Sequence, residues 1–371
     1  MLLKEYIQYW FDTYRKPQQA PATAEKSYTY VKYHIIETSL GEMEIADIRT
    51  KDIQTLLNDL KDHGNCLKLK YNRHKGLGLA PATLKKVRQA LCSAFRYAMI
   101  DGLVTRNYAE ETQPIRSKTM RKTRPFTYEQ KIEFLRIVKS HRFFIAYLLL
   151  FSTGMRRSEA LGLSWDNIDL EKKTIDICQT LIMFQNKPYL RRDTKNESSA
   201  RLIPIPEQLI PYLKLLHAKQ RDEAESCNNY HNPDNLIFTN RNGGCVNPIQ
   251  FSHNFKNVIT RHGFPNELHI HSIRHTWVTD MLQQNVPIID IQNLGGWSRP
   301  DTLLRVYAHT VKKTQISAIN KLCASFIGRI VKLSATPLRN RPHMVFCSQG
   351  TSWGAGSTHG TSVGCNPLAY P

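Results

Sequence analysis

Three side chains between residues 271 and 307 have the types and spacing for phosphodiester chemistry. His271 and Arg274 lie three residues apart at the start of a helix predicted over 272–284, and therefore share one helix face. The N-terminus of such a helix favours a phosphate, because its backbone N–H groups and its dipole attract anions. Tyr307 follows on a later helical segment, after the break at Gly295 and Gly296. We therefore expect this tyrosine to attack a phosphodiester that the cations hold.

The chain carries a large excess of positive charge. Its 371 residues include 51 Lys and Arg against 31 Asp and Glu, which gives a formal net charge of +20. Such an excess favours a polyanionic partner, because electrostatic steering and counterion release then supply much of the affinity. Two other interpretations stay open at this point, a merely basic soluble protein and one that binds anionic membranes.

Length, apolar runs and cysteines limit the class of protein further. A chain of 371 residues has room for two ordinary domains with their own cores. The longest apolar run, 143–151, is only nine residues and too short to cross a bilayer. The N-terminus resembles an amphipathic helix and not a signal peptide. The 8 cysteines include no CxxC pair, which is typical of reduced thiols in a cytosol.

The N-terminal part is predicted to be a four-helix unit, followed by a basic linker. Apolar residues at helical spacing predict helices over 2–15, 23–38, 48–63 and 81–100, with a basic loop over 66–79. The linker, 114–125, contains five cations and no acid: Arg116, Lys118, Arg121, Lys122 and Arg124. Such a run is typical of a solvated linker, but between two domains it could equally lie along a DNA phosphate backbone.

The second part is predicted to be mainly helical with a small β-sheet. Thr127 and Gln130 form a capping-box pattern for a helix over 127–139, and a buried helix follows over 143–151. Short β-type runs occupy 174–177, 180–184 and 202–205. Further helices are expected over 207–225, over 248–261 with Asn247 as its cap, and over 312–330. The composition of 331–371, rich in Ser, Gly, Thr and Pro, predicts a disordered tail.

Four segments resemble, in this order, the signature boxes of tyrosine recombinases: TGMRRSEALGL, DTKNESSARLIPIP, HIHSIRHTW and LGGWSRPDTLLRVYAH. The nearest members are the integrases of phages and conjugative elements. The resemblance implies an N-terminal helical, SAM-like core-binding domain and a catalytic domain that together close around DNA as a C-shaped clamp. It divides the chain into a core-binding domain (1–113), the linker (114–125), a catalytic domain (126–330) and the tail (331–371).

The resemblance also implies which residues act. Arg156 matches the first catalytic arginine, and Glu159 matches a nearby acidic position that orients this arginine. Trp297 stands where the family has histidine or tryptophan. The remaining matches are the lysine of the β-hairpin, the H-x-x-R pair and the nucleophile: Lys195, His271, Arg274 and Tyr307. Because a hairpin register is hard to read from one sequence, three neighbours are alternatives to the lysine: Lys187, Arg191 and Arg192.

These residue types fit transfer of a phosphoryl group to tyrosine. A tyrosine pKa of about 10 means that forming the phenolate at pH 7 costs roughly 4 kcal/mol, which cations and a proton acceptor must offset. Arg156 and Arg274 can stabilise charge on the non-bridging oxygens. Lys195 can protonate the leaving 5′ oxygen, and His271 can donate to the phosphate or accept the phenolic proton. Trp297 offers an indole N–H but cannot relay a proton.

The resemblance further implies a 3′-phosphotyrosyl intermediate that needs no metal and no nucleotide cofactor. The expected partner is double-stranded DNA carrying recombination sites, bound by a homotetramer on two sites in the bacterial cytosol, near the nucleoid and away from membranes. An accessory excision factor or a host DNA-bending factor would be a further partner. Many such integrases carry an arm-binding domain ahead of the core-binding domain, and here Met1 lies almost on the first core-binding helix.

Three rival interpretations remain. A type IB topoisomerase uses a similar set of residues as a monomer and only relaxes supercoils. A DNA-binding relic would occupy its sites without cutting them. A zinc site would use His269, His271 and His275 with Glu267 nearby, but no HExxH motif is present, and Arg274 would place a cation beside the ion.

Overall fold

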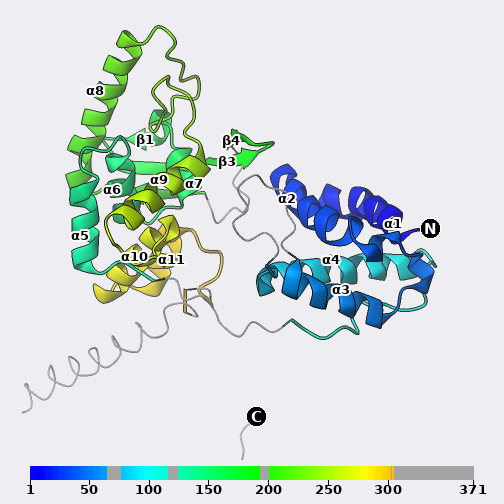
Figure 1. Cartoon of the computed structure of the whole chain (residues 1–371). Helices are drawn as coiled ribbons and strands as arrows, with labels where there is room; N and C mark the ends of the chain where they lie inside the picture. The colour runs from blue at the N-terminus through cyan, green and yellow to red at the C-terminus, as the bar shows by residue number, and fades with distance from the viewer. Residues whose placement is uncertain (65–76, 116–123, 193–199, 302, 305–371) are drawn as a thin grey trace, which may run out of the picture. The chain divides into compact units, whose positions relative to one another are not determined.

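The computed structural model describes residues 1–64, 77–115, 124–192, 200–301 and 303–304 (Figure 1). The described parts are mainly helical with small sheets, which confirms the predicted fold class. Most of the predicted loop over 66–79, most of the linker, the helix expected over 312–330 and the tail lie outside the described residues. In the described parts, no helix has both the length and the apolar character to cross a membrane.

The N-terminal helices follow the predicted order closely. The elements are α1 (Leu3–Trp10) with a π-helical continuation (Phe11–Arg15), α2 (Pro21–Val31) with a second one (Lys32–Ile36), α3 (Thr50–His63) and α4 (Pro81–Ile100). Proline occupies the first position of α2 and of α4, where its fixed φ favours the helix and its missing N–H is no loss. The second helix therefore begins at Pro21, two residues earlier than the predicted 23.

These helices close around one apolar core. Side chains at three- and four-residue spacing on α1, including Tyr6, Ile7 and Trp10, are at most 1% exposed. They pack with apolar residues of α3 and α4 such as Ile53 and Phe95. Tyr6 and Trp10 are therefore core residues, as expected, whereas Tyr9 of the same helix is 50% exposed.

The elements after the linker begin with α5 (Tyr128–Ile137), α6 (Phe144–Thr153) and α7 (Arg157–Leu161). After the strands come α8 (Ile210–Ser226), α9 (Pro248–Arg261), α10 (Ile270–Gln283) and α11 (Ile288–Gly295). Two of the predicted caps form, since Thr127 Oγ1 accepts from the Gln130 N–H at 3.3 Å and Asn247 Oδ1 from the Ile249 N–H at 2.9 Å. The turn after Gly154 continues into α7, a short helix that the sequence analysis did not predict.

The described strands form two small antiparallel sheets, so the small β-sheet that we predicted is divided in two. One sheet has the order β1 (Ile168–Asp169), β2 (Thr174–Ile177) and β5 (Arg201–Pro204); the other is a hairpin of β3 (Thr180–Phe184) and β4 (Lys187–Arg191). The hairpin turns through Gln185 and Asn186, whose φ angles of 47° and 60° suit a two-residue loop. Because β2 pairs with β5, the hairpin between them is left as a separate sheet.

A second apolar core holds the elements after the linker. The nearly wholly apolar α6 lies inside it, among aromatic side chains that include Phe126, Phe134 and Phe255. A smaller cluster joins α10 to α11, which lie side by side in Figure 1, and Leu303 packs into it at 1% exposure. These contacts fix α10 between α6 and α11, and α10 carries His271 and Arg274.

The helix that carries His271 begins earlier than predicted. We expected it to start at residue 272, but α10 begins at Ile270, with His269 as its N-cap. The reason is a local hydrogen-bond exchange, in which the His269 N–H donates to Ser272 Oγ at 3.2 Å and His269 Nδ1 lies 2.7 Å from the same oxygen. His271 therefore lies in the first turn of the helix and not before it.

Candidate active site

The structure describes five of the seven residues singled out for catalysis or its support. Arg156 is the N-cap residue of α7, Glu159 lies within this helix, and Trp297 follows α11. His271 and Arg274 are on α10. Lys195 and Tyr307 lie outside the described residues, as do four of the linker cations: Arg116, Lys118, Arg121 and Lys122. The fifth linker cation, Arg124, is exposed.

The turn formed by Gly295 and Gly296 brings the two arginines together. Arg274 donates from Nη2 to the Gly295 carbonyl, and Arg156 donates from Nη2 to the Gly296 carbonyl, each at 2.7 Å. Arg274 also donates from Nη1 to the carbonyl of Gly154 at 2.7 Å, just before Arg156 in the chain. Carbonyls of the turns at Gly154 and at Gly295–Gly296 thus orient both guanidinium groups. Because Gly295 and Gly296 are adjacent, the two guanidinium groups lie close to one another.

Glycine is required at the positions that supply these carbonyls. A Cβ at Gly295 would lie 1.8 Å from Cζ3 of Trp297, and one at Gly154 would lie 2.2 Å from Cδ2 of Trp277. Gly154 and Gly296 also have φ angles of +64° and +68°, which side chains strongly disfavour. The glycines therefore let the backbone approach closely enough to bind the arginines.

Trp297 covers the guanidinium of Arg274. The Cζ of Arg274 lies 3.6 Å from the centroid of the Trp297 ring, in cation–π geometry. Arg274 is 3% exposed, so its charge is held in a site largely shielded from water. A tryptophan at this position can hold the arginine in place, whereas it cannot exchange a proton.

Glu159 is a buried carboxylate shared by two arginines. It is 2% exposed and accepts from Arg156 twice, from the backbone N–H at 2.8 Å and from Nη1 at 2.6 Å. Arg201 donates to it from Nη2 at 2.9 Å and from Nη1 at 3.3 Å. Burial by itself would raise the pKa of Glu159, but the hydrogen bonds and charge of Arg201, with the charge of Arg156, lower it to about 2. Glu159 is therefore ionised at neutral pH and suits an orienting role.

Replacing Glu159 with Gln should lower the free energy of unfolding at pH 7 by about 3–5 kcal/mol, because it breaks a buried ion pair. The folded-state pKa of this carboxyl lies below its ordinary value of 4.5, so its stabilisation is present above pH 4.5 and lost toward pH 2. The difference between wild type and Glu159→Gln should therefore shrink as the pH falls through this range, as measured by denaturant unfolding. Glu133→Gln, which breaks the exposed pair with Arg136, should leave stability nearly unchanged, because water screens this pair. A Glu159→Gln difference that is equally large at pH 7 and pH 3 would contradict this account.

His271 is neutral at pH 7. Part of its side chain reaches solvent, but the protein packed around the imidazole disfavours the charged form. The positive charges of Arg274 and Arg156 add to this effect, and the pKa of His271 falls to about 4. A neutral imidazole has one N–H donor and one acceptor nitrogen, so it can either donate to a phosphate or accept a proton.

The histidines of this region show no arrangement for a metal ion. The rings of His271 and His275 meet edge to face with centroids 5.0 Å apart. Within the described ranges, no three His, Cys, Asp or Glu side chains are grouped so that they could hold a metal. The described geometry thus gives the zinc interpretation no support.

Arg201 is a residue of this site that the sequence analysis did not single out. The sequence shows it only as one cation in a basic stretch, directly before the apolar alternation of β5. Its partner Glu159 is 42 positions away in the chain, so spacing gives no signal for the pair. Only the fold brings the two residues together.

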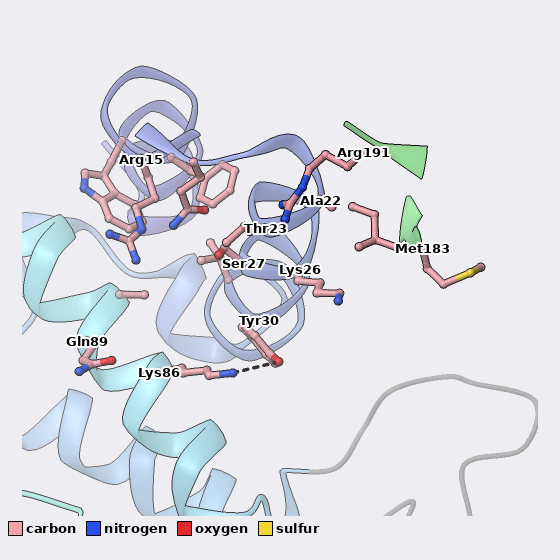
Figure 2. A pocket seen from close by; sticks show the side chains of 16 residues that line it. Arg15, Ala22, Thr23, Lys26, Ser27, Tyr30, Lys86, Gln89, Met183 and Arg191 are labelled. Atoms are coloured by element: carbon pink, nitrogen blue, oxygen red, sulfur yellow. Dashed lines mark hydrogen bonds between the residues drawn. The ribbon is translucent and has the colours of Figure 1, made fainter. Parts of the chain in front are cut away.

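Exposed cations also occur on the N-terminal helices. Figure 2 shows Lys86 of α4 reaching Tyr30 of α2, with a distance of 3.5 Å from Lys86 Nζ to the tyrosine hydroxyl. Lys26 lies on α2 as well, and Arg15 ends the π-helical continuation of α1. All three basic side chains are exposed, and none of them was predicted as a binding residue.

Two family models match the chain. The phage integrase family model matches residues 121–314, and the model of the phage integrase N-terminal SAM-like domain matches residues 2–61. The first match spans the segments that carry the candidate active site, Lys195 and Tyr307. The second spans α1, α2 and most of α3.

Named relatives and solved structures agree with these models. A tyrosine recombinase XerC-like protein of Caldanaerobacter subterraneus subsp. tengcongensis is 27% identical over 88% of this chain and 83% of its own length. The ICEBs1 integrase of Bacillus subtilis is 23% identical over 66% of each chain. The Tn1549 transposon integrase in complex with transposon right end DNA superposes with a TM-score of 0.69 at 18% identity, covering 87% of this chain and all of that one. A lambda integrase tetramer bound to a Holliday junction gives 0.57 at 15% identity, over 81% of this chain and 75% of that one. At such identities the structural likenesses establish the fold.

Proposed function

The chain belongs to the phage integrase family of tyrosine recombinases, and we propose that it cuts and rejoins duplex DNA at specific sites through Tyr307. One observation carries this proposal most directly. Two arginines from different segments, Arg156 and Arg274, are held on the adjacent carbonyls of Gly295 and Gly296. Such a pair of oriented guanidinium groups suits the non-bridging oxygens of a phosphodiester in transit.

The proposed step exchanges one phosphoester bond for another. The phenolic oxygen of Tyr307 attacks phosphorus, a bond forms between them, and the bond from phosphorus to the 5′ oxygen breaks. The phenolic proton passes to an acceptor, for which neutral His271 is suited, and the leaving 5′ oxygen takes a proton from Lys195. Because the phosphoryl group stays covalently bound to the tyrosine, rejoining to a second 5′-hydroxyl needs no further energy source. Positioning and electrostatics supply most of the rate enhancement in such reactions.

We propose supporting roles for Glu159 and Trp297, and their described contacts are consistent with these roles. Glu159 orients Arg156 by bonds to its side chain and its backbone. Trp297 covers Arg274 and shields its charge from water, which strengthens the attraction between this arginine and a phosphate. Both residues thus act through an arginine, without exchanging a proton themselves.

The proposal includes two domains joined by the basic linker. Two separate apolar cores, one formed by residues before 116 and one by residues after 125, support a division between 1–113 and the part that begins at 126. We propose the full division as 1–113, 114–125 and 126–330, followed by a tail over 331–371. The two domains would close around DNA as a C-shaped clamp. The exposed cations on the N-terminal helices, Arg15, Lys26 and Lys86, are candidates for phosphate contacts along with those of the linker.

The proposed assembly is a homotetramer on two double-stranded DNA sites. A lambda integrase is found as a tetramer on a Holliday junction and as a dimer on a core site, and exchange of four strands needs four nucleophiles. We further propose that the protein integrates or excises a mobile element or prophage in the bacterial cytosol, near the nucleoid. An accessory excision factor or a host DNA-bending factor would set the direction of the reaction.

A plasmid assay separates this function from its rivals. The recombination site is first identified by selecting, from the DNA that flanks the gene, the sequence that the protein binds. The substrate is a supercoiled plasmid that carries two copies of this site. A recombinase exchanges strands between the two sites, and so yields rearranged plasmids only when both sites are present. It needs neither metal nor ATP. A topoisomerase would relax plasmids with two sites or none equally and exchange no strands. A binding relic would protect the site and leave the plasmid unchanged.

A further inference from the structure

We propose that Arg201 is a positioning residue that couples the segment carrying Lys195 to Arg156 and to the Gly295–Gly296 turn. This inference rests on the proposed function, because it assigns Arg201 a role in the same reaction. Arg201 would act through other residues and would not touch the DNA. Its importance lies in the three parts of the site that it joins.

The first link runs to the α7 segment. The side chain of Arg201 is 7% exposed and pairs with Glu159, whose carboxylate also binds Arg156. A carboxylate that bonds to two guanidinium groups fixes their relative positions, because both arginines share the same two oxygens. Without Arg201, the Glu159 carboxylate would lose two of its described hydrogen bonds and keep the two from Arg156.

The second link runs to the glycine turn. Arg201 donates from Nε to the Leu294 carbonyl at 2.6 Å, and Leu294 directly precedes the two glycines that accept from Arg274 and Arg156. A Cβ at Gly296 would lie 2.8 Å from Nη1 of Arg201, so the guanidinium also packs against the turn itself. Arg201 therefore supports the acceptors of both catalytic arginines.

The third link runs along the backbone to Lys195. Arg201 is the first residue of β5 and pairs with Ile177 of β2. Lys195 lies in the segment between Arg191, the last residue of β4, and Arg201. The buried side chain of Arg201 thus anchors the end of this segment to the same groups that orient Arg156.

The test measures single-turnover cleavage of saturating DNA by wild type, Arg201→Met and Arg201→Lys. We expect Arg201→Met to bind DNA as wild type does and to cleave it about 10²-fold more slowly. A displacement of a catalytic group by about 1 Å has an effect of this size. Arg201→Lys keeps a charge near Glu159 but loses the planar guanidinium that bonds through two nitrogens. This variant should therefore cleave at an intermediate rate. All rates are measured below the unfolding midpoint of each variant.

Arg142→Met is the matched control. Arg142 likewise pairs with one carboxylate through two nitrogens, at 2.7 and 2.8 Å from Glu223, and donates to two main-chain carbonyls. Its partners Glu223, Thr239 and Asn240 include none of the proposed catalytic residues. Because the Arg142–Glu223 pair is more exposed than the Arg201–Glu159 pair, Arg142→Met should lose less stability than Arg201→Met, and it should cleave DNA at the wild-type rate.

A substrate with sulfur in place of the bridging 5′ oxygen separates the effect of Arg201 on Lys195 from its effect on Arg156. Its thiolate leaves without a proton, so this substrate should restore cleavage by Lys195→Ala and leave the defect of Arg156→Ala. If Arg201 positions both Lys195 and Arg156, this substrate should restore only some of the cleavage that Arg201→Met has lost. Cleavage by Arg201→Met at the wild-type rate, or a defect no larger than that of Arg142→Met, would overturn the inference alone. A wild type that forms no covalent complex with its site would overturn the proposed function, and this inference with it.

Discussion

Arg274→Lys is expected to slow DNA cleavage by about 10³-fold while the affinity for DNA stays nearly unchanged. Lysine keeps the positive charge but has one nitrogen, which cannot donate to the carbonyls of Gly154 and Gly295 and still face a phosphate. Loss of a single oriented donor to the transition state costs about 10²–10³ in rate, and here the cation that remains is also misplaced. The rate constant for covalent-complex formation at saturating DNA measures this effect.

The same substitution should also destabilise the fold. A lysine would leave at least one of two buried carbonyls without its arginine donor, at a cost of about 1–3 kcal/mol. It would also lose the contact of the flat guanidinium with the Trp297 ring. Arg136→Lys, an exposed change on α5, is the control and should affect neither rate nor stability. An Arg274→Lys variant that cleaves within about tenfold of wild type would show that orientation by the two turns is unimportant.

Tyr307→Phe is expected to abolish covalent attachment to DNA while binding is retained. Phenylalanine keeps the ring and removes only the oxygen that we propose attacks phosphorus, so the loss should fall on chemistry and not on affinity. Tyr212→Phe, at a half-exposed position on α8, is the matched control and should cleave as wild type does. The readout is the fraction of protein linked to labelled DNA after denaturation, with DNA binding measured in parallel.

The described structure leads toward Tyr307 without including it. Leu303 is buried against α10 and α11, and the Leu304 N–H donates to the Pro300 carbonyl at 2.9 Å. Leu303, four residues before Tyr307 in the sequence, thus packs against the helix that carries His271 and Arg274. A covalent band that survives in Tyr307→Phe would place the nucleophile elsewhere.

Local rules predicted much of the fold. Capping residues and apolar spacing fixed the starts of α5 and α9, because Thr127 and Asn247 satisfy backbone donors within their own turns. The start of α10 was missed because His269, an unusual cap, shares hydrogen bonds with Ser272. The division into two sheets was not predicted because β2 pairs with β5 across the β3–β4 hairpin. Pairing between strands so far apart in the chain produces no local sequence pattern.

The residue types of the site could be predicted, but their connections could not. Spacing placed His271 and Arg274 on one helix, and the signature boxes indicated Arg156 and Glu159. The acceptors of the arginines are main-chain carbonyls, which every residue has, so no pattern distinguishes those of Gly295 and Gly296. For the same reason the part played by Arg201 becomes visible only when the fold brings it to Glu159.

Covalent trapping on a nicked duplex tests most directly whether Tyr307 is the nucleophile. Wild type and Tyr307→Phe are incubated with a site nicked so that the cleaved fragment diffuses away, with chelator and without added metal. We expect a protein–DNA band for wild type only, with the protein attached to the 3′ phosphate and a free 5′-hydroxyl released. A band that needs metal, a band in both proteins, or a 5′ attachment would contradict this expectation.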